Sequence, residues 1–183
     1  VVQEGVNSYD EGVSALLNKN YNNSIEKFKL AERKLKSSKI TDHGLNFSRG
    51  QLSIAYLCSG ETSTLGQVKS KLGKITNKLY DSRDWTYNMA VVNYEYATKK
   101  IIRYEKDNEK WKEKAKQSEF LKDAIRLFKL TIKHDKLYLA PYQNLAYIYN
   151  QLGDENKSEK YLNLYNKRRN ELIRSFDATT DAF

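Results

Sequence analysis

The sequence predicts an all-α protein, and three observations support this fold class. Only eight glycines and one proline occur among 183 residues, too few for the tight turns that join the strands of a sheet. Apolar residues recur at steps of three and four along most of the chain, which is the period of one helix face. Short polar stretches separate these runs, as expected for helices joined by short connections. The chain is long enough for one compact domain or one elongated array.

The first four helices follow from apolar stripes and capping residues. The first helix is predicted over residues 5–18. Its apolar face consists of Val6, Tyr9, Val13, Leu16 and Leu17. A second helix begins with Asn23 as its N-cap, and Glu26 three residues later makes a near match to the capping box. Asp42 caps a third helix that ends at Gly60. A fourth helix carries one long apolar seam made of Leu65, Val68, Leu72, Ile75 and Leu79.

The fifth helix opens at Ser82 or Asp84 and departs from the pattern of short paired helices. The charged stretch 103–118 follows it and contains neither Gly nor Pro. Nothing in that stretch would stop a helix, so we expect the fifth helix to run on through it. A sixth helix then extends from about Ser118 to His134.

The last two helices are separated by a short turn. Pro141 fits the first turn of the seventh helix, and Gly153 lies in the turn that ends it. The eighth helix extends to Phe176. We expect the tail, residues 177–183, to be frayed.

The last helix pair carries a motif that recurs more weakly along the chain. The motif residues are Tyr142, Leu145, Ala146, Tyr149, Gly153, Asp154, Ser158, Leu162 and Tyr165. They resemble the tetratricopeptide repeat pattern, W-x2-L-G-x2-Y followed by Gly-Asp and A-x3-F-x2-A. Similar spacing indicates repeats at 5–38, 45–80, 84–135 with an insertion, and 139–172. The resemblance implies a single domain over residues 1–183, a right-handed superhelix of helix pairs, with an over-long helix or insertion near 97–118.

The resemblance also implies a function, because members of this family are mostly binding scaffolds in which the first helices of successive pairs line a concave groove. The groove positions in this chain are Tyr9, Val13, Phe47, Ile54, Trp85, Asn88, Val92, Tyr96, Gln143, Tyr147 and Asn150. Aromatic anchors with side-chain amides suit a peptide or an amphipathic helix of another protein. Two alternatives stay open. Each apolar residue is more often core than site, and the groove could be filled by the 97–118 extension or by the tail, with Phe176 or Phe183 as plugs.

A second candidate surface lies in the charged stretch. Tyr104, Trp111 and Ala115 share one helix stripe amid Lys and Glu residues. A stripe of this kind on an exposed helix would dock a second protein or a second copy of the chain.

Catalysis, metals and cofactors have little support in the sequence. His43 and His134 lie far apart, without Cys or carboxylates at metal-ligand spacing. The single cysteine, Cys58, lies on an apolar helix face and is interpreted as a packed residue rather than a nucleophile. No Gly-rich phosphate loop is present. We therefore expect a protein without enzymatic activity, bound metal or cofactor.

The net charge of +9 raises an alternative function. A basic adaptor could bind RNA or an anionic membrane through convex lysines. We favour a solvated surface, because the lysines occur singly on predicted outer helix faces, and we do not expect nucleic acid as the main partner.

No apolar run reaches the length of a membrane span, and the chain begins without Met or a basic-then-apolar signal. We expect a processed or trimmed chain from a bacterial cell envelope, with the cytoplasm as the alternative. Membrane contact would then come only through a removed N-terminal segment or through a partner.

Overall fold

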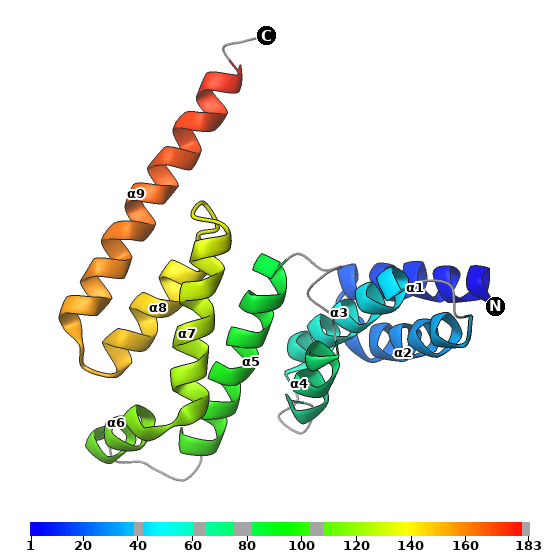
Figure 1. Cartoon of the computed structure of the whole chain (residues 1–183), viewed down its shortest axis with the longest axis horizontal. Coiled ribbons are helices and arrows are strands. Elements are labelled where there is room, and N and C mark those ends of the chain that lie inside the picture. Colours follow the sequence, from blue (N-terminus) through cyan, green and yellow to red (C-terminus); the bar gives the residue numbers. More distant parts are fainter. Residues whose placement is uncertain (39–41, 61–64, 75–81, 103–107, 181–183) are drawn as a thin grey trace. The chain divides into compact units, whose positions relative to one another are not determined.

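The computed structural model describes residues 1–38, 42–60, 65–74, 82–102 and 108–180 (Figure 1). Every regular element within these ranges is an α-helix, which confirms the all-α class for the described part of the chain. None of these helices is both long and apolar enough to span a bilayer. The chain divides into two compact units, residues 1–92 and residues 93–183, and the boundary falls within helix α5, Ser82–Ile102.

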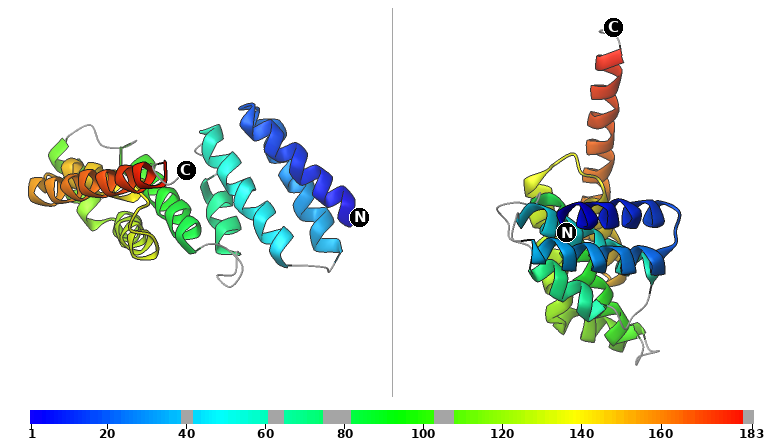
Figure 2. Two further views of the ribbon diagram at one scale, coloured as in Figure 1. Left: turned by 90° about the horizontal axis from the view of Figure 1, so that it is seen from above. Right: turned by 90° about the vertical axis from the view of Figure 1, so that its right-hand side faces the viewer.

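The first unit contains α1 (Val2–Leu17), α2 (Tyr21–Ser37), α3 (Asp42–Ser59), α4 (Leu65–Gly73) and the first half of α5. Helices α1 and α2 lie side by side and antiparallel (Figures 1 and 2). Its fully or nearly buried apolar side chains include Ala15, Ile25, Phe28, Ala31, Leu52, Ala55, Tyr56, Val68 and Leu72.

Small residues of α1 set the distance between α1 and α2. A Cβ atom at Gly12 would lie 2.8 Å from the ring of Phe28, and one at Gly5 would lie 2.9 Å from the side chain of Leu35. Only glycine leaves room for these large side chains, so the sequence of α1 permits the close packing that buries Phe28 completely.

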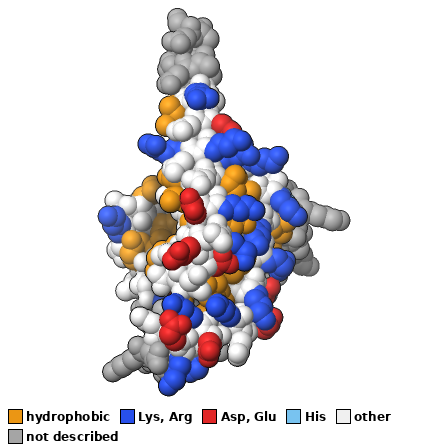
Figure 3. Space-filling model, turned by 90° about the vertical axis from the view of Figure 1, so that its left-hand side faces the viewer, with side chains coloured by type: hydrophobic (Ala, Val, Ile, Leu, Met, Phe, Trp, Pro, Cys, Tyr) orange, Lys and Arg blue, Asp and Glu red, His pale blue; other side chains and the backbone are white. Residues whose placement is uncertain are grey.

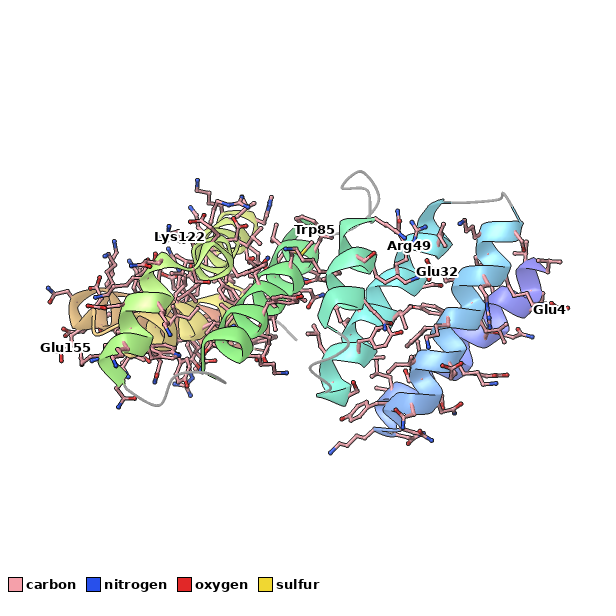
Figure 4. All side chains as sticks on the ribbon, turned by 90° about the horizontal axis from the view of Figure 1, so that it is seen from below. Glu4, Glu32, Arg49, Trp85, Lys122 and Glu155 are labelled. Atoms are coloured by element: carbon pink, nitrogen blue, oxygen red, sulfur yellow. The ribbon has the colours of Figure 1, made fainter. Side chains whose placement is uncertain are left out.

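An ion network joins α2, α3 and α4 within the first unit. The Glu32 carboxylate accepts from Arg49 Nε at 3.2 Å and also pairs with the Lys71 ammonium group. Arg49 donates a further hydrogen bond to the carbonyl oxygen of Lys74 at 3.3 Å. Burial acts to raise the pKa of Glu32, but the hydrogen bonds from Lys71 and Arg49 outweigh it and lower that pKa. Figure 4 shows Glu32 and Arg49 on neighbouring helices, which this network holds together.

The second unit contains the rest of α5, then α6 (Asn108–Gln117), α7 (Glu119–His134), α8 (Ala140–Gln151) and α9 (Glu155–Thr180). Ser118 caps α7 through a hydrogen bond that its hydroxyl oxygen accepts from the backbone of Leu121. Pro141 lies in the first turn of α8, as predicted. The buried apolar side chains of this unit include Ala97, Ala115, Leu121, Ala124, Leu127, Phe128, Tyr142, Leu145, Ile148 and Tyr149.

The turns of the α1–α2 and α8–α9 pairs have the same geometry. The last turn of the first helix is followed by a residue with positive φ, Lys19 at 57° and Gly153 at 74°. The next residue caps the second helix, because the side-chain oxygen of Asn20 or Asp154 accepts from the backbone N–H three residues later, at 3.3 and 3.1 Å. The backbone N–H groups of Asn20 and Asp154 also bond to the carbonyl five residues earlier in both turns.

The same two helix pairs share a hydrogen bond across their interface. The Ser24 hydroxyl donates to the carbonyl oxygen of Gly12 at 2.9 Å, and the Ser158 hydroxyl donates to that of Ala146 at 2.9 Å. In both cases twelve residues separate the donor from the acceptor. The first and last helix pairs therefore repeat one local structure.

Three predicted helix boundaries are corrected. The N-cap of α2 is Asn20 rather than Asn23, because the Asn20 side chain accepts from the Asn23 backbone. Helix α4 ends at Gly73, and Ile75 and Leu79 of its predicted seam lie outside the described residues. Helix α9 continues to Thr180, past its predicted end at Phe176, and residues 181–183 lie outside the described part, so the frayed tail stays a prediction.

The predicted continuous helix through 103–118 is also wrong. Helix α5 ends at Ile102, and α6 is a separate helix with a different direction (Figure 1). Helix α6 buries Ala115 against the second unit, where only 1% of it is exposed. Helix propensity alone favours one long rod, but a rod would leave this apolar stripe in water.

Candidate functional site

The exposed face of α8 in the second unit carries three of the predicted groove residues. Gln143, Tyr147 and Asn150 follow one another at steps of four and three, and all three side chains are exposed. The Tyr147 side chain is 55% exposed, which is unusual for a large ring on a well-packed helix. The opposite face of α8 is buried through Tyr142, Leu145, Ala146, Ile148 and Tyr149. The face is therefore presented by a helix that is firmly seated in its unit.

Tyr94 of α5 holds the ring of Tyr147 in place. The two ring centroids lie 6.5 Å apart and the rings meet edge to face at 79°. Burial, together with the neighbouring Tyr147 and Glu95, raises the pKa of the Tyr94 hydroxyl well above its ordinary value. Tyr94 is thus a neutral, half-buried support for an exposed partner ring.

Two other predicted groove residues near the middle of the chain do not lie on this face. Val92 has no exposed surface and is a core residue. The Tyr96 ring packs on the Phe120 ring of α7, with centroids 4.9 Å apart, so it faces away from Tyr94 along α5. The tetratricopeptide resemblance implies a groove position for both residues, but neighbouring helices cover them.

The predicted anchors of the first unit are half-buried. Tyr9 packs on Phe28 with ring centroids 5.6 Å apart. Burial raises the pKa of Tyr9. Trp85 uses its Nε1 to donate to the carbonyl oxygen of Leu72 at 2.8 Å, which ties α5 to α4. Both side chains therefore stabilise the unit.

The remaining predicted binding residues of the first unit are half-buried or have side chains that the structure does not describe. Val13, Ile54 and Asn88 are half-buried. The side chain of Phe47 lies outside the described residues. The described predicted anchors of the first unit are thus only partly open to solvent, whereas the three predicted residues of α8 are exposed.

The predicted second surface faces inward. Trp111 is half-buried, and Ala115 beside it is buried. Among the described residues, the Trp111 Nε1 has no hydrogen-bond partner. Both side chains line a small cavity of about 10 Å³, whose other walls are Tyr94, Ala97, Thr98, Leu121, Ile148 and Gln151. The expected exposed docking stripe is therefore corrected to an internal contact, and Tyr104 lies outside the described residues.

One contributor to the site was missed at the sequence level. Tyr94 matches the last residue of the W-x2-L-G-x2-Y pattern in the third predicted repeat, 84–135, but is not among the predicted binding residues. The repeat motif could have identified Tyr94 as part of the site, because Tyr94 and Tyr147 come from the first helices of the third and fourth predicted pairs. Helices packed side by side in that order bring such residues together.

We call Gln143, Tyr147 and Asn150 of α8, together with Tyr94 of α5, the α5–α8 face. Its side chains are suited to binding another molecule. An exposed phenol ring and two carboxamides can contact apolar groups and both donate and accept hydrogen bonds. Within the described ranges, no group of three or more His, Cys, Asp or Glu side chains is placed to hold a metal ion.

No protein-family model matches this chain, and no curated protein matches it either.

Proposed function

We propose that this protein is a non-catalytic scaffold that binds a segment of another polypeptide on the face formed by α8 and the adjacent part of α5. The observation that carries the proposal is the exposed row of Gln143, Tyr147 and Asn150 on a helix whose other face is buried. The tetratricopeptide resemblance and a right-handed superhelical arrangement of the pairs belong to the same proposal. The repeated turn geometry of the first and last pairs supports them.

The Tyr147 ring is suited to act as the central anchor. Interface energy concentrates in a few residues, and tyrosine is among the commonest of these. A ring already fixed by Tyr94 loses little rotamer freedom when a partner binds, so less of the contact energy is lost to ordering. Its exposed edge and hydroxyl group remain available to the ligand.

The flanking amides would set the register of the bound segment. Each carboxamide has one acceptor oxygen and two donor hydrogens, the complement of a peptide backbone unit. Gln143 and Asn150 lie two helical turns apart on either side of Tyr147. An extended peptide would therefore meet a donor–acceptor group, a ring and a second donor–acceptor group in turn.

A function as a basic adaptor for RNA or an anionic membrane has weaker support. Many basic side chains already pair with carboxylates, among them Lys27, Lys34, Lys71 and Lys157. Paired ammonium groups contribute less to a field that attracts polyanions. We therefore treat polyanion binding as an outcome of the test rather than as a second proposal.

The proposal is tested with a random peptide library selected against the full chain. The affinity of the selected peptides is then measured for Tyr147→Ala, with Phe176→Ala as a matched control that also removes an exposed aromatic ring. We expect Tyr147→Ala to weaken binding by about tenfold or more and Phe176→Ala to leave it unchanged. Circular dichroism checks that both variants keep their helicity.

The dependence of affinity on salt concentration distinguishes a peptide ligand from a polyanion. Peptide binding by a ring and two amides should change little as salt rises, whereas polyanion binding falls steeply because counterions are released. Peptides that bind Tyr147→Ala as tightly as the unchanged chain would overturn the proposal. An affinity that collapses with salt, together with competition by RNA or by phosphatidylserine vesicles, would overturn it in favour of the basic adaptor.

A further inference from the structure

The C-terminal half of α9 extends beyond the helices that cover its first half. The Tyr149 ring of α8 stacks on the Tyr161 ring in the first half of α9, with the ring centroids 5.7 Å apart, and α9 then continues to Thr180. Figures 1 and 2 show this part of α9 running past α7 and α8. We call residues 169–180 the α9 overhang.

The overhang and the turns before it carry an exposed apolar stripe. Leu162, Ile173 and Phe176 lie within about a quarter of the helix circumference and are between 44% and 65% exposed. Arg169 lies in the middle of this stripe, one turn before Ile173. Figure 3 shows hydrophobic side chains of the projecting helix set among Lys and Arg. We call these four residues the α9 stripe.

The residues around the α9 stripe are mostly basic. Five Lys or Arg residues and only one acidic residue, Glu171, occur from Lys160 to Phe176, both ends included. Arg169 forms no ion pair among the described residues, whereas Arg168 is engaged with Glu171. A surface that buries the apolar side chains of the stripe must therefore also supply a negative charge opposite Arg169.

Helix α1 has an apolar face with a negative charge beside it. Val2, Val6, Val13 and Leu17 lie within about a quarter of the helix circumference, and we call these residues the α1 seam, whereas the neighbouring Tyr9 packs on Phe28 of α2. Val6 is 40% exposed and Leu17 is 79% exposed. The α2 side of α1 uses the small residues Gly5, Ser8, Gly12 and Ala15, so most large apolar side chains of α1 lie on the seam instead.

The α1 seam lies beside negative charge, which is what the basic α9 stripe requires of a partner surface. Residues 1–18 contain three acidic residues and no Lys or Arg, although the chain as a whole carries +9. Glu4 and Glu11 pair with Lys34 and Lys27 of α2. Asp10 lies at the edge of the seam, one turn from Val6 and from Val13, and forms no ion pair among the described residues.

We propose that the protein self-associates head to tail, the α9 stripe of one copy docking on the α1 seam of another, with Arg169 facing Asp10. This goes beyond the proposed function, because the α1 seam and the α9 stripe share no residue with the α5–α8 face. Two symmetric alternatives are disfavoured, since pairing α9 with α9 places Arg169 against Arg169 and pairing α1 with α1 places Asp10 against Asp10. A head-to-tail contact is heterologous, so it extends into chains or closes into rings.

The test measures the average mass of the full chain by sedimentation from about 5 to about 500 µM, because so small an apolar contact predicts weak association. We expect the mass to rise with concentration beyond that of a dimer. Asp10→Arg and Arg169→Glu should each weaken the association by about tenfold or more, since each sets like charges opposite one another. Arg174→Glu changes the same charge on another side of α9 and should have no such effect, and neither should Tyr147→Ala.

Charge complementation gives the decisive measurement. An equimolar mixture of Asp10→Arg and Arg169→Glu should associate again, because every contact then joins opposite charges, and the double variant should also recover. Circular dichroism confirms that the single variants are folded. A chain that stays monomeric at every concentration would overturn the proposal. So would association that does not respond to either single substitution. So would a double variant that fails to recover, as expected for a symmetric contact, in which residue 10 or residue 169 still faces its own charge.

Discussion

At the scale of single residues, the two repeated turns differ in one informative position. Gly153 adopts a φ of 74°, a conformation that glycine enters without strain. Lys19 occupies the matching position in the α1–α2 turn with a φ of 57°. A side chain in this left-handed region crowds its own backbone, so Lys19 stores strain that Gly153 avoids.

We predict that Lys19→Gly stabilises the protein by about 0.5 to 1 kcal/mol, because relief of the strain exceeds the added flexibility of the unfolded chain. Gly153→Lys should destabilise it by about 1 kcal/mol, since a Cβ there meets nothing closer than 4.0 Å and only the backbone is strained. Urea unfolding followed by circular dichroism measures both. A loss of stability in Lys19→Gly would contradict the assigned turn geometry.

At the scale of helices, close packing depends on where small residues fall. Helix α1 approaches α2 so closely that a methyl group at Gly12 would overlap the Phe28 ring. In the last pair, Ala146 occupies the matching position and carries such a methyl group, and the residue that corresponds to Phe28 is the half-exposed Leu162. The two pairs thus share hydrogen bonds but not the same interhelical fit.

We predict that Gly12→Ala destabilises the first unit by about 1 to 3 kcal/mol, because neither the buried ring nor the backbone can move freely. Gly66→Ala is the matched control, since a Cβ at Gly66 meets nothing within 4 Å. That substitution should stabilise α4 by about 0.5 to 1 kcal/mol through helix propensity. Equal effects of the two substitutions on the midpoint of urea unfolding would show that α1 and α2 are not packed this closely.

At the scale of the whole molecule, ionisable groups set the pH range of stability. The pKa values of Glu4, Glu26 and Asp154 are lowered by hydrogen bonds from Lys34, Lys29 and Lys157, and that of Glu32 is lowered despite its burial. Their stabilisation is present above the unfolded pKa of about 4 and is lost as pH falls through the folded values. Burial raises the pKa values of Tyr9, Tyr94 and Tyr161.

We therefore predict a stability plateau from about pH 5 to about pH 9, with losses on both sides. On the alkaline side, the unfolded chain ionises these tyrosines near pH 10 while the folded protein keeps them neutral, so folding loses stability above that pH. The free energy of unfolding across pH, with tyrosinate absorbance recorded in parallel, measures this. Ionisation of all 14 tyrosines while the chain remains helical would contradict the burial of Tyr94.

The features that the sequence predicted well are local ones. The all-α class, the start of a helix near Ser118, the place of Pro141 and the turn at Gly153 depend on residues within a few positions of each other. The tetratricopeptide resemblance also selected Gln143, Tyr147 and Asn150, and all three lie in one exposed row on α8. Backbone hydrogen bonds in a helix span four residues, so short windows of sequence contain most of this information.

Only the tertiary structure decided which amphipathic faces are covered. Helical spacing is the same for Tyr147, which is exposed, and for Val92, which is buried. The separation of α6 from α5 and the inward position of Trp111 depend on contacts with α7 and α8, which lie elsewhere in the chain. A helix pattern states which side chains share a face, but the free energy of burial depends on what packs against that face, and this comes from residues distant in sequence.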